Sequence, residues 1–154
     1  MPLVIRNYVL VDLDHVVFDA FWRDPMIGTA SWDEYHAAGR EDTPVYDIVH
    51  LLKALSDSGH TIIGFTARPA KWRKQSMEMC LKFDVPLDDL LMRPDDNYRP
   101  APEVKMELAL AFFRSEQLLK ESVALVLDDR EDVCAAFKGL GITTLQVHAR
   151  KNPR

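Results

Sequence analysis

The sequence has few of the features that mark membrane proteins or disulfide-rich proteins. It contains only two cysteines, Cys80 and Cys134, and their spacing fits neither a metal motif nor a disulfide framework. Two reduced thiols are typical of a cytoplasmic protein, which is the location we expect. No apolar run approaches the roughly 20 residues of a membrane helix. The stretch Met1–Arg6 is too short and wrongly flanked for a signal peptide, so we expect no membrane contact.

Positive charge is also scarce. The 19 Lys and Arg residues face 24 Asp and Glu residues, which leaves a formal net charge of −5. This balance argues against broad, non-specific binding to nucleic acid, although it leaves room for a local basic patch. The Gly-x-x-x-x-Gly-Lys-Ser/Thr phosphate loop of many kinases is absent from the sequence. Hydrophobic residues make up 47% of the 154 residues, which suits one domain with a sizeable core.

Short apolar segments alternate with longer amphipathic ones. We expect strands at residues 8–13, 60–65, 90–92, 122–127 and 143–147. We expect helices from Thr43 (N-cap, with Pro44 in the first turn) to Ser58, and at 69–83, 101–119 and 131–140. This alternation predicts an α/β fold, a three-layer, Rossmann-like parallel sheet with helices on both faces. The helix residues predicted to face the core are Val45, Ile48, Val49, Leu52, Leu55, Trp72, Met79, Cys80, Phe83, Val104, Leu108, Ala111, Phe112 and Leu119.

Residues 18–43 differ from the rest of the chain. They are rich in aromatic residues, with Pro and Gly as breakers, so we interpret them as an irregular insert with one short helix, Trp32–Ala38, capped by Ser31. This insert is expected to be part of a single domain that spans residues 1–154. Its large aromatic side chains either stack on a base or pin the insert onto the sheet; they are Trp22, Trp32 and Tyr35.

Polar groups follow three of the five expected strands, and strand ends of this kind meet at one edge of a parallel sheet. The groups are Asp12 and Asp14, Thr66 and Arg68, and Asp128, Asp129 and Arg130. Four carboxylates at one edge repel one another unless a cation neutralises them. Oxygen ligands alone favour Mg²⁺ over Zn²⁺. Thr66, with backbone N–H groups at a following helix N-terminus, is a candidate phosphate seat, and Lys105 a candidate cation for a transferring group.

Taken in order, Asp12-Leu13-Asp14, Thr66, Lys105 and Asp128-Asp129 resemble the four motifs of the haloacid dehalogenase (HAD) superfamily of phosphohydrolases. The resemblance implies a HAD-like fold with a minimal cap or none, because the insert at 18–43 is too short for the full helical cap domain of many superfamily members. The site is therefore expected to be open, with at most a small lid. The resemblance also implies that Asp12 is the nucleophile, which forms an aspartyl-phosphate, and that Asp14 is the general acid/base. Thr66 and Lys105 would bind the phosphoryl group. The implied Mg²⁺ ligands are Asp12, Asp14 (through its backbone carbonyl), Asp128 and Asp129.

A closer resemblance is to the phosphatase domain of phage-type polynucleotide kinase 3′-phosphatases. It rests on Thr66-Ala67-Arg68, Val104-Lys105 and Leu127-Asp128-Asp129-Arg130. It implies that Arg68 and Arg130 contact the substrate phosphate or the neighbouring backbone. One residue departs from the pattern, because His15 stands where the family normally has Gly. Either the tight turn tolerates His15, or its ring reaches the substrate or the leaving group.

These features predict a Mg²⁺-dependent phosphomonoesterase that removes 3′-phosphates from nucleic-acid ends. One alternative is a 5′(3′)-nucleotidase whose insert closes over the base of a free nucleotide. Another is a non-catalytic module that binds phosphorylated ends. The basic run of Lys71, Arg73 and Lys74 is either a solvated helix face or a track for phosphates. The sequence indicates no protein partner. We expect structural or surface roles for Asp95, Asp96, His36, His50, His60 and His148.

Overall fold

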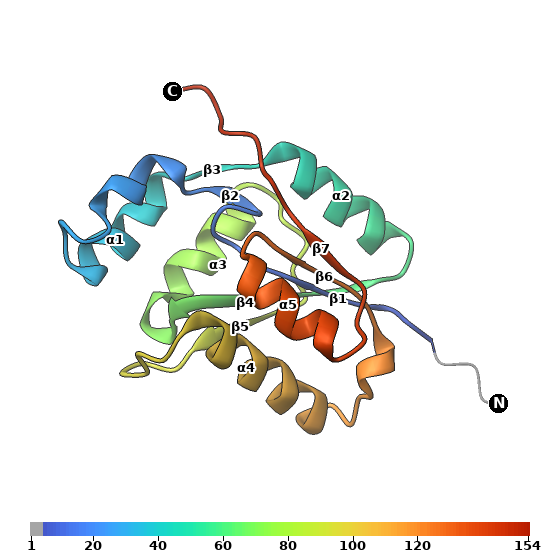
Figure 1. Cartoon of the computed structure of the whole chain (residues 1–154). Coiled ribbons are helices and arrows are strands. Elements are labelled where there is room, and N and C mark those ends of the chain that lie inside the picture. Colours follow the sequence, from blue (N-terminus) through green and yellow to red (C-terminus); the bar gives the residue numbers. More distant parts are fainter. Residues whose placement is uncertain (1–4) are drawn as a thin grey trace.

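The computed structural model describes residues 5–154, whose centre is a five-stranded sheet (Figure 1). All neighbouring strands in it are parallel, and their order is β5-β4-β1-β6-β7. The strands are β1 (Tyr8–Val11), β4 (Thr61–Pro69), β5 (Asp89–Arg93), β6 (Val123–Asp128) and β7 (Thr144–Gln146). From β1 the chain adds β4 and β5 on one side, and after β5 it crosses back to add β6 and β7 on the other, so β4 and β6 lie on either side of β1. Their C-terminal ends form one edge beside the end of β1.

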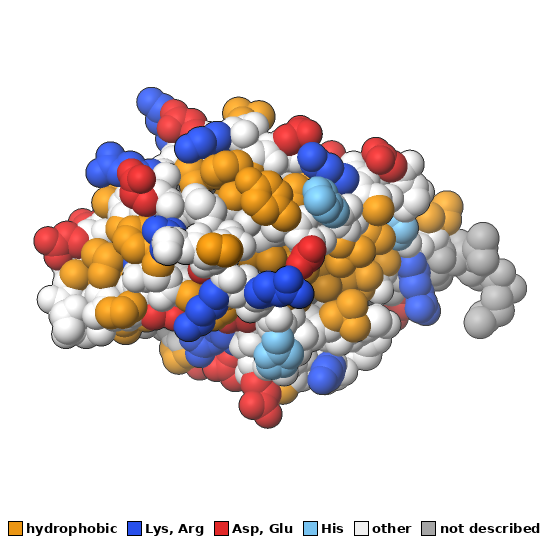
Figure 2. Space-filling model, turned by 90° about the horizontal axis from the view of Figure 1, so that it is seen from above, with side chains coloured by type: hydrophobic (Ala, Val, Ile, Leu, Met, Phe, Trp, Pro, Cys, Tyr) orange, Lys and Arg blue, Asp and Glu red, His pale blue; other side chains and the backbone are white. Residues whose placement is uncertain are grey.

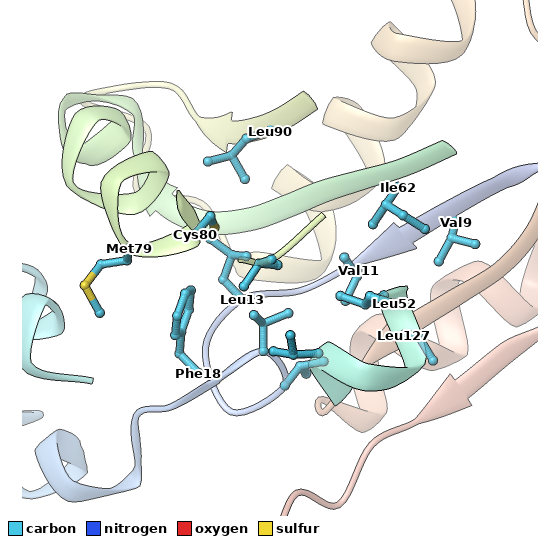
Figure 3. Packing of buried hydrophobic residues seen from close by; sticks show 14 of the residues in the cluster. Val9, Val11, Leu13, Phe18, Leu52, Ile62, Met79, Cys80, Leu90 and Leu127 are labelled. Atoms are coloured by element: carbon cyan, nitrogen blue, oxygen red, sulfur yellow. The ribbon is translucent and has the colours of Figure 1, made fainter. Parts of the chain in front are cut away.

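Helices cover both faces of this sheet. On one face lie α2 (Tyr46–Asp57) and α3 (Arg73–Lys82), and on the other α4 (Ala101–Ser115) and α5 (Glu131–Gly139). Alternate residues of β1 serve the two layers, because successive side chains in a strand point to opposite faces. Val9 and Val11 pack with Leu52 of α2 (Figure 3), whereas Leu10 packs with Phe137 of α5. The predicted three-layer α/β architecture is confirmed.

The insert begins and ends at a small antiparallel sheet of β2 (Phe18–Asp19) and β3 (Thr43–Pro44). Between these strands the chain forms η1 (Phe21–Met26), α1 (Trp32–Ala38) and η2 (Gly39–Glu41). The predicted cap of α1 is present as a capping box. The Ser31 hydroxyl accepts the Glu34 N–H at 3.1 Å, and the Glu34 carboxylate accepts the Ser31 N–H at 2.8 Å.

The C-terminal tail is hydrogen-bonded to the two-stranded sheet of β2 and β3 at the base of the insert. The Asn152 N–H donates to the buried Asp19 carboxylate at 2.6 Å, and the Asn152 amide donates to the Pro44 carbonyl at 2.9 Å. The Arg154 guanidinium lies 4.4 Å from the centre of the Trp22 ring. Segments more than a hundred residues apart in the sequence are thus joined, which restrains the insert beside the sheet edge.

Two predicted helix starts are wrong. The helix expected from Thr43 begins at Tyr46, because Thr43–Pro44 pair with β2 and the Val45 N–H donates to the Val17 carbonyl at 2.7 Å. The helix expected from Pro69 begins later as well. Pairing with β5 keeps the chain extended through Pro69, and η3 (Ala70–Trp72) then leads into α3.

The predicted end of the helix at 101–119 is also wrong. The helix stops at Ser115, and Gln117 turns the chain with a φ of 54° before η4 (Lys120–Ser122). Leu119 is 62% exposed, so its predicted place in the core is wrong. Ala111 is exposed too, because Ala109 and Phe113 hold the buried positions of this helix.

Among residues 5–154, no helix is long and apolar enough to cross a membrane. Residues 1–4, most of the stretch considered above for a signal peptide, lie outside the described part of the chain. The face seen from above mixes basic, acidic and hydrophobic side chains (Figure 2), in keeping with the formal charge of −5.

Candidate active site

Three carboxylates meet where β1 and β6 end. Asp12 follows β1, and its N–H donates to the Leu127 carbonyl at 3.0 Å, which fixes the level of the two strand ends. Asp128 ends β6 and Asp129 follows it. One carboxylate oxygen of each of the three residues lies within 4.8 Å of the others. A shared divalent cation fits such a set of hard oxygen donors.

Lys105 lies against this cluster although its side chain is almost completely buried. From the second turn of α4, its Nζ lies 2.9 Å from Asp12 Oδ1 and 2.5 Å from Asp128 Oδ2. Burial opposes its charge, but the Asp12 and Asp128 carboxylates outweigh burial and raise the pKa of Lys105. A buried lysine held by two carboxylates supplies a fixed positive charge beside Asp12.

Burial has the largest effect on the pKa of Asp12. Burial raises the pKa of Asp12 well above its usual value, and the nearby Asp128, Asp129 and Asp14 charges raise it further. The charge of Lys105 acts in the opposite direction. A cation bound among the carboxylates would also favour the ionised form, which is the form that can attack an electrophile.

Asp14 lies two residues beyond Asp12 and has a different environment. Its Oδ1 accepts from Arg68 Nη2 at 2.6 Å and from Arg23 Nη2 at 2.7 Å. Burial alone would raise the pKa of Asp14, but the two guanidinium charges outweigh it and hold the pKa well below the usual range. This carboxylate therefore belongs to an arginine pair rather than to the three-carboxylate cluster, and the predicted contribution of its backbone carbonyl to a metal stays a prediction.

The sequence did not point to Arg23 or to Asp42. Arg23 is 1% exposed, and its guanidinium makes two bonds to the buried Asp42 carboxylate, Nε–Oδ1 at 3.0 Å and Nη2–Oδ2 at 2.7 Å. Trp22 Nε1 also donates to Asp42 at 2.7 Å, and the Arg23 guanidinium lies 4.3 Å from the centre of the Tyr35 ring. No local pattern separates such an arginine from a solvated one. The only hint was its place in an aromatic-rich segment.

Thr66 is fully buried in β4, and its Oγ1 accepts the Arg68 N–H at 3.2 Å. The predicted helix N-terminus near Thr66, at Pro69, is not found, because β4 continues to Pro69 and α3 begins at Arg73. The backbone N–H groups near Thr66 therefore belong to an extended, irregular strand end. Ser76 of α3, also fully buried, accepts from Arg68 Nη1 at 3.0 Å and fixes the other side of that guanidinium.

His15 has a backbone conformation that explains why a glycine is expected at this position. Its φ is 63°, in the left-handed region that L-residues adopt at a cost. Two contacts of the ring offset that cost. Its Nε2 lies 2.8 Å from Asp24 Oδ1, and the ring meets Phe21 edge-on at 4.6 Å. The turn thus tolerates His15, while its Nδ1 lies 4.0 Å from Asp129.

The predicted site residues meet at one cavity of about 530 Å³. Eight of the nine line it, and the ninth, Asp128, is fully buried and reaches the cluster from beneath. The eight are Asp12, Asp14, His15, Thr66, Arg68, Lys105, Asp129 and Arg130. Arg130 is exposed at the rim, where its guanidinium pairs with Asp132 at 2.7 Å.

Two segments outside the sheet complete the cavity walls. One is the insert, through Ile27, Trp32, Tyr35 and His36, and the other is the loop between β5 and α4, through residues 97–100. Both project from the same side of the molecule, on the left of Figure 1. The insert therefore forms a wall of the site, and the cavity stays open to solvent between insert and loop.

The charges of this region fit a divalent cation. Five carboxylates face three cationic side chains, which leaves two negative charges in a largely buried site. The carboxylates are those of Asp12, Asp14, Asp42, Asp128 and Asp129, and the cations are Arg23, Arg68 and Lys105. Buried charges of one sign are costly unless they are paired or bound to a metal. One Mg²⁺ ion in the three-carboxylate cluster would balance them.

The family is decided by a comparison of sequence. A sequence model of the family described as "Polynucleotide kinase PNKP phosphatase domain" matches residues 6–151. The chain belongs to this family. It is thus a phosphatase domain of the HAD type, as the order of its motifs predicted. No curated protein sequence matches the chain significantly.

Solved structures resemble this phosphatase domain over nearly all of its length. A chain in the structure of the Pnkp1/Rnl/Hen1 complex is 26% identical, with a TM-score of 0.77. The match covers 95% of the phosphatase domain but only 47% of that chain, so the domain spans about half of its relative's length. A HAD-like hydrolase from Streptococcus pneumoniae, 15% identical, gives a TM-score of 0.65 over 91% of the domain and 83% of its own chain.

A third structure bears on the metal. A HAD-family enzyme from Bacteroides thetaiotaomicron, in complex with magnesium and inorganic phosphate, gives a TM-score of 0.59 at 15% identity. The match covers 95% of the phosphatase domain and 96% of that chain. At this identity the likeness establishes a shared fold, while the argument for a cation here rests on this chain's own carboxylates.

Proposed function

We propose that this phosphatase domain removes terminal phosphates from the 3′ ends of nucleic acids, through an aspartyl-phosphate on Asp12. The observation that carries the proposal is the arrangement around one cavity. A nucleophile candidate next to a buried lysine, a three-carboxylate metal cluster and an arginine-bound carboxylate all lie at the same sheet edge. Together they supply what transfer of a phosphoryl group to a carboxylate needs.

In the first step, an oxygen of Asp12 attacks phosphorus, and the bond from phosphorus to the 3′-oxygen breaks. Lys105, held 2.9 Å from Asp12, and the Thr66 hydroxyl orient the phosphoryl oxygens. Mg²⁺ bound by Asp12, Asp128 and Asp129 would neutralise phosphoryl charge and orient the group. Asp14 gives a proton to the leaving 3′-oxygen.

Asp14 can act as an acid only if substrate changes its environment. Without substrate, Arg23 and Arg68 hold its pKa low, so the carboxyl is ionised. A dianionic phosphate beside Arg68, the arginine that lines the cavity, competes for its charge and raises the pKa of Asp14. In the second step Asp14 takes a proton from water, the water oxygen attacks phosphorus, and the bond from Asp12 to phosphorus breaks to release phosphate.

Two observations support a polymer end as the substrate. The family match is to a polynucleotide kinase phosphatase domain, and the cavity is open between the insert and the loop. One similar structure is an RNA repair complex that contains Pnkp1, so RNA ends are substrates to test as well as DNA ends. Cys80 and Cys134 are both free and buried, which supports the cytoplasmic location we propose.

A nucleotidase acting on free nucleotides is the second candidate, because the insert places aromatic side chains on one cavity wall. A non-catalytic module is less favoured, since Asp12 and the metal carboxylates are all in place.

The deciding experiment compares 3′-phosphorylated oligonucleotides, 5′-phosphorylated oligonucleotides and free nucleotides, each with Mg²⁺ and with EDTA. We expect phosphate release from 3′ ends with Mg²⁺ only. Asp12→Asn is expected to fold and to bind metal without turnover, whereas Asp57→Asn, an exposed acid at the end of α2, keeps wild-type turnover. Preference for free nucleotides would assign the nucleotidase. Turnover by Asp12→Asn would contradict the mechanism.

A further inference from the structure

Two exposed aromatic side chains face the cavity from opposite walls. Trp32 is the first residue of α1 in the insert and is 58% exposed; Tyr98 lies in the loop between β5 and α4 and is 85% exposed. Both line the cavity that holds Asp12. Among residues 5–154, the third strongly exposed aromatic is Tyr46, which lies on α2 outside the cavity.

The other aromatic residues of the insert have structural roles. Trp22 donates to the buried Asp42 and packs under Arg154, and Tyr35 is 6% exposed beneath the Arg23 guanidinium. Trp22 and Tyr35 therefore hold the insert together and connect it to the C-terminal tail. Trp32 is the member of the group that has an open ring face.

Both walls hold their aromatic residue firmly. The capping box fixes the first turn of α1, and the Trp32 ring lies nearly parallel to the His36 ring one turn later, at 27° and 6.0 Å. On the other wall, the Arg93 guanidinium donates to the carbonyls of Asn97 at 2.9 Å and Arg99 at 2.7 Å, on either side of Tyr98.

Lys71 joins the two walls. Its Nζ lies 2.6 Å from Asp33 of α1, and its N–H donates to Asp95 of the loop at 3.0 Å. Trp32 and Tyr98 therefore belong to segments with a common anchor, and their relative placement is restrained.

Most cations near this rim have an acidic neighbour, and Arg93, which also lines the cavity, is hydrogen-bonded to backbone carbonyls. Arg99 pairs with Glu107 and Arg130 with Asp132. In the basic run, Lys71 pairs with Asp33 and Arg73 with Asp89, while Lys74 lies 4.0 Å from Glu78. Because these arginines and lysines have acidic neighbours, they do not form a continuous unpaired basic surface for a phosphate backbone. The exposed aromatic rings of Trp32 and Tyr98 are the main surface available for binding at the rim.

We propose that Trp32 and Tyr98 stack on the unpaired bases next to the terminal phosphate, which selects single-stranded ends of at least two nucleotides. The inference rests on the proposed function, because it assumes that the phosphate at Asp12 belongs to a nucleic-acid 3′ end. Unpaired bases expose both ring faces, whereas the bases inside a duplex are stacked and cannot reach the two walls. Stacking on an aromatic side chain tolerates any sequence, so no base preference is expected.

The test measures kcat/KM for 3′-phosphorylated single strands of one, two, three and six nucleotides, a blunt duplex and p-nitrophenyl phosphate. For the wild type, kcat/KM is expected to rise from one to three nucleotides and then level off, and to be lower on the blunt duplex. Trp32→Ala and Tyr98→Ala are each expected to lose about 5- to 100-fold on the longer single strands, mainly through KM. On p-nitrophenyl phosphate, which carries no neighbouring bases, the losses of both variants are expected to be much smaller.

Tyr46→Ala is the matched control, because Tyr46 is as exposed as Trp32, at 58%, and lies outside the cavity. It is expected to match the wild type on every substrate, and Trp32→Phe and Tyr98→Phe are expected to recover most of the loss. Wild-type rates that do not depend on length, or variant losses that are equal on p-nitrophenyl phosphate, would overturn this inference alone. Turnover of p-nitrophenyl phosphate with none of any 3′-phosphorylated nucleotide or oligonucleotide would overturn the proposed function as well.

Discussion

The two sides of the site are built by different means. On the sheet side, the ends of β1 and β6 carry Asp12, Asp128 and Asp129, and backbone hydrogen bonds of the parallel sheet set their separation. On the insert side there is no sheet to do this. There, a buried arginine, Arg23, joins Asp42 of the insert to Asp14 at the sheet edge.

The two sides differ in whether their carboxylates already have cationic partners. The carboxylates on the sheet side lie close together, and burial raises the pKa of Asp12. A bound cation is therefore needed to stabilise the ionised carboxylates on the sheet side. The carboxylates on the insert side already have their cations in Arg23 and Arg68. Metal dependence should therefore belong to the first side, and proton transfer and substrate selection to the second.

Metal removal gives the largest expected effect and acts on the sheet side alone. EDTA is expected to abolish turnover, and added Mg²⁺ to restore it and raise the melting temperature, because the ion binds only the folded cluster. Asp129→Asn is expected to raise the Mg²⁺ concentration for half-maximal turnover by at least about 10-fold. Arg23→Lys on the insert side should leave that concentration unchanged. A changed half-maximal Mg²⁺ concentration in Arg23→Lys would contradict the proposed division of roles between the two sides.

Arg23 gives the next largest effect, now on the insert side. Arg23→Met removes both guanidinium hydrogen bonds to the buried Asp42 and leaves the longer contact to Arg68, at 3.6 Å, as its charge pairing, and we expect a loss of about 3–5 kcal/mol in the free energy of unfolding. Arg23 also acts as a positioning residue for Asp14. Arg23→Met is therefore expected to lower turnover about 100-fold on a substrate with a sugar leaving group, which must be protonated. The loss should be much smaller on p-nitrophenyl phosphate, whose leaving group needs no proton.

The control for Arg23→Met is Arg40→Met, an exposed arginine in the same insert that is expected to behave as the wild type in unfolding and turnover. Arg23→Lys keeps the charge without the two-pronged contact, and we expect an intermediate result. An equal loss on both substrates would mean that Arg23 supports the fold and not the proton transfer.

The same contrast explains what the sequence could predict. Asp12, Thr66 and Asp128 were predictable because apolar strands carry them to one edge, and strand ends of a parallel sheet converge whatever the loops do. The start of α2 was not, because Thr43 and Pro44 suit a helix N-terminus locally but pair with β2 instead. Arg23 could not be found at all, since its partners lie 9 and 19 residues away and no periodicity links them.

His36 offers a smaller effect that depends on pH. Burial lowers the pKa of its ring to about 4, against an ordinary 6.5. The unfolded chain therefore binds a proton between about pH 6.5 and pH 4 that the folded chain refuses, so stability is lost as the pH falls through this window. We expect this group to account for about 2 kcal/mol of the loss, after discounting for its partial exposure.

The check is urea unfolding from pH 7 to pH 4. His36→Phe is expected to flatten the curve in this window, and His50→Phe, at an exposed site on α2, to keep the wild-type shape. A His36→Phe curve that falls as steeply as the wild type would show that His36 does not set the acid sensitivity in this window.

His15 lies where the two sides join, and its replacement by the family's usual glycine should have the smallest effect. His15→Gly relieves a left-handed residue with a φ of 63° but loses the contacts to Asp24 and Phe21 and adds freedom to the unfolded chain. Because these contributions oppose one another, the free energy of unfolding is expected to change by less than about 1 kcal/mol. If the ring only fills the turn, kcat/KM on a 3′-phosphorylated oligonucleotide stays within about threefold of the wild type. A more than threefold rise in KM on the oligonucleotide, with KM for p-nitrophenyl phosphate unchanged, would instead show that the His15 ring contacts the substrate. His15 would then belong to the substrate-binding wall of the cavity.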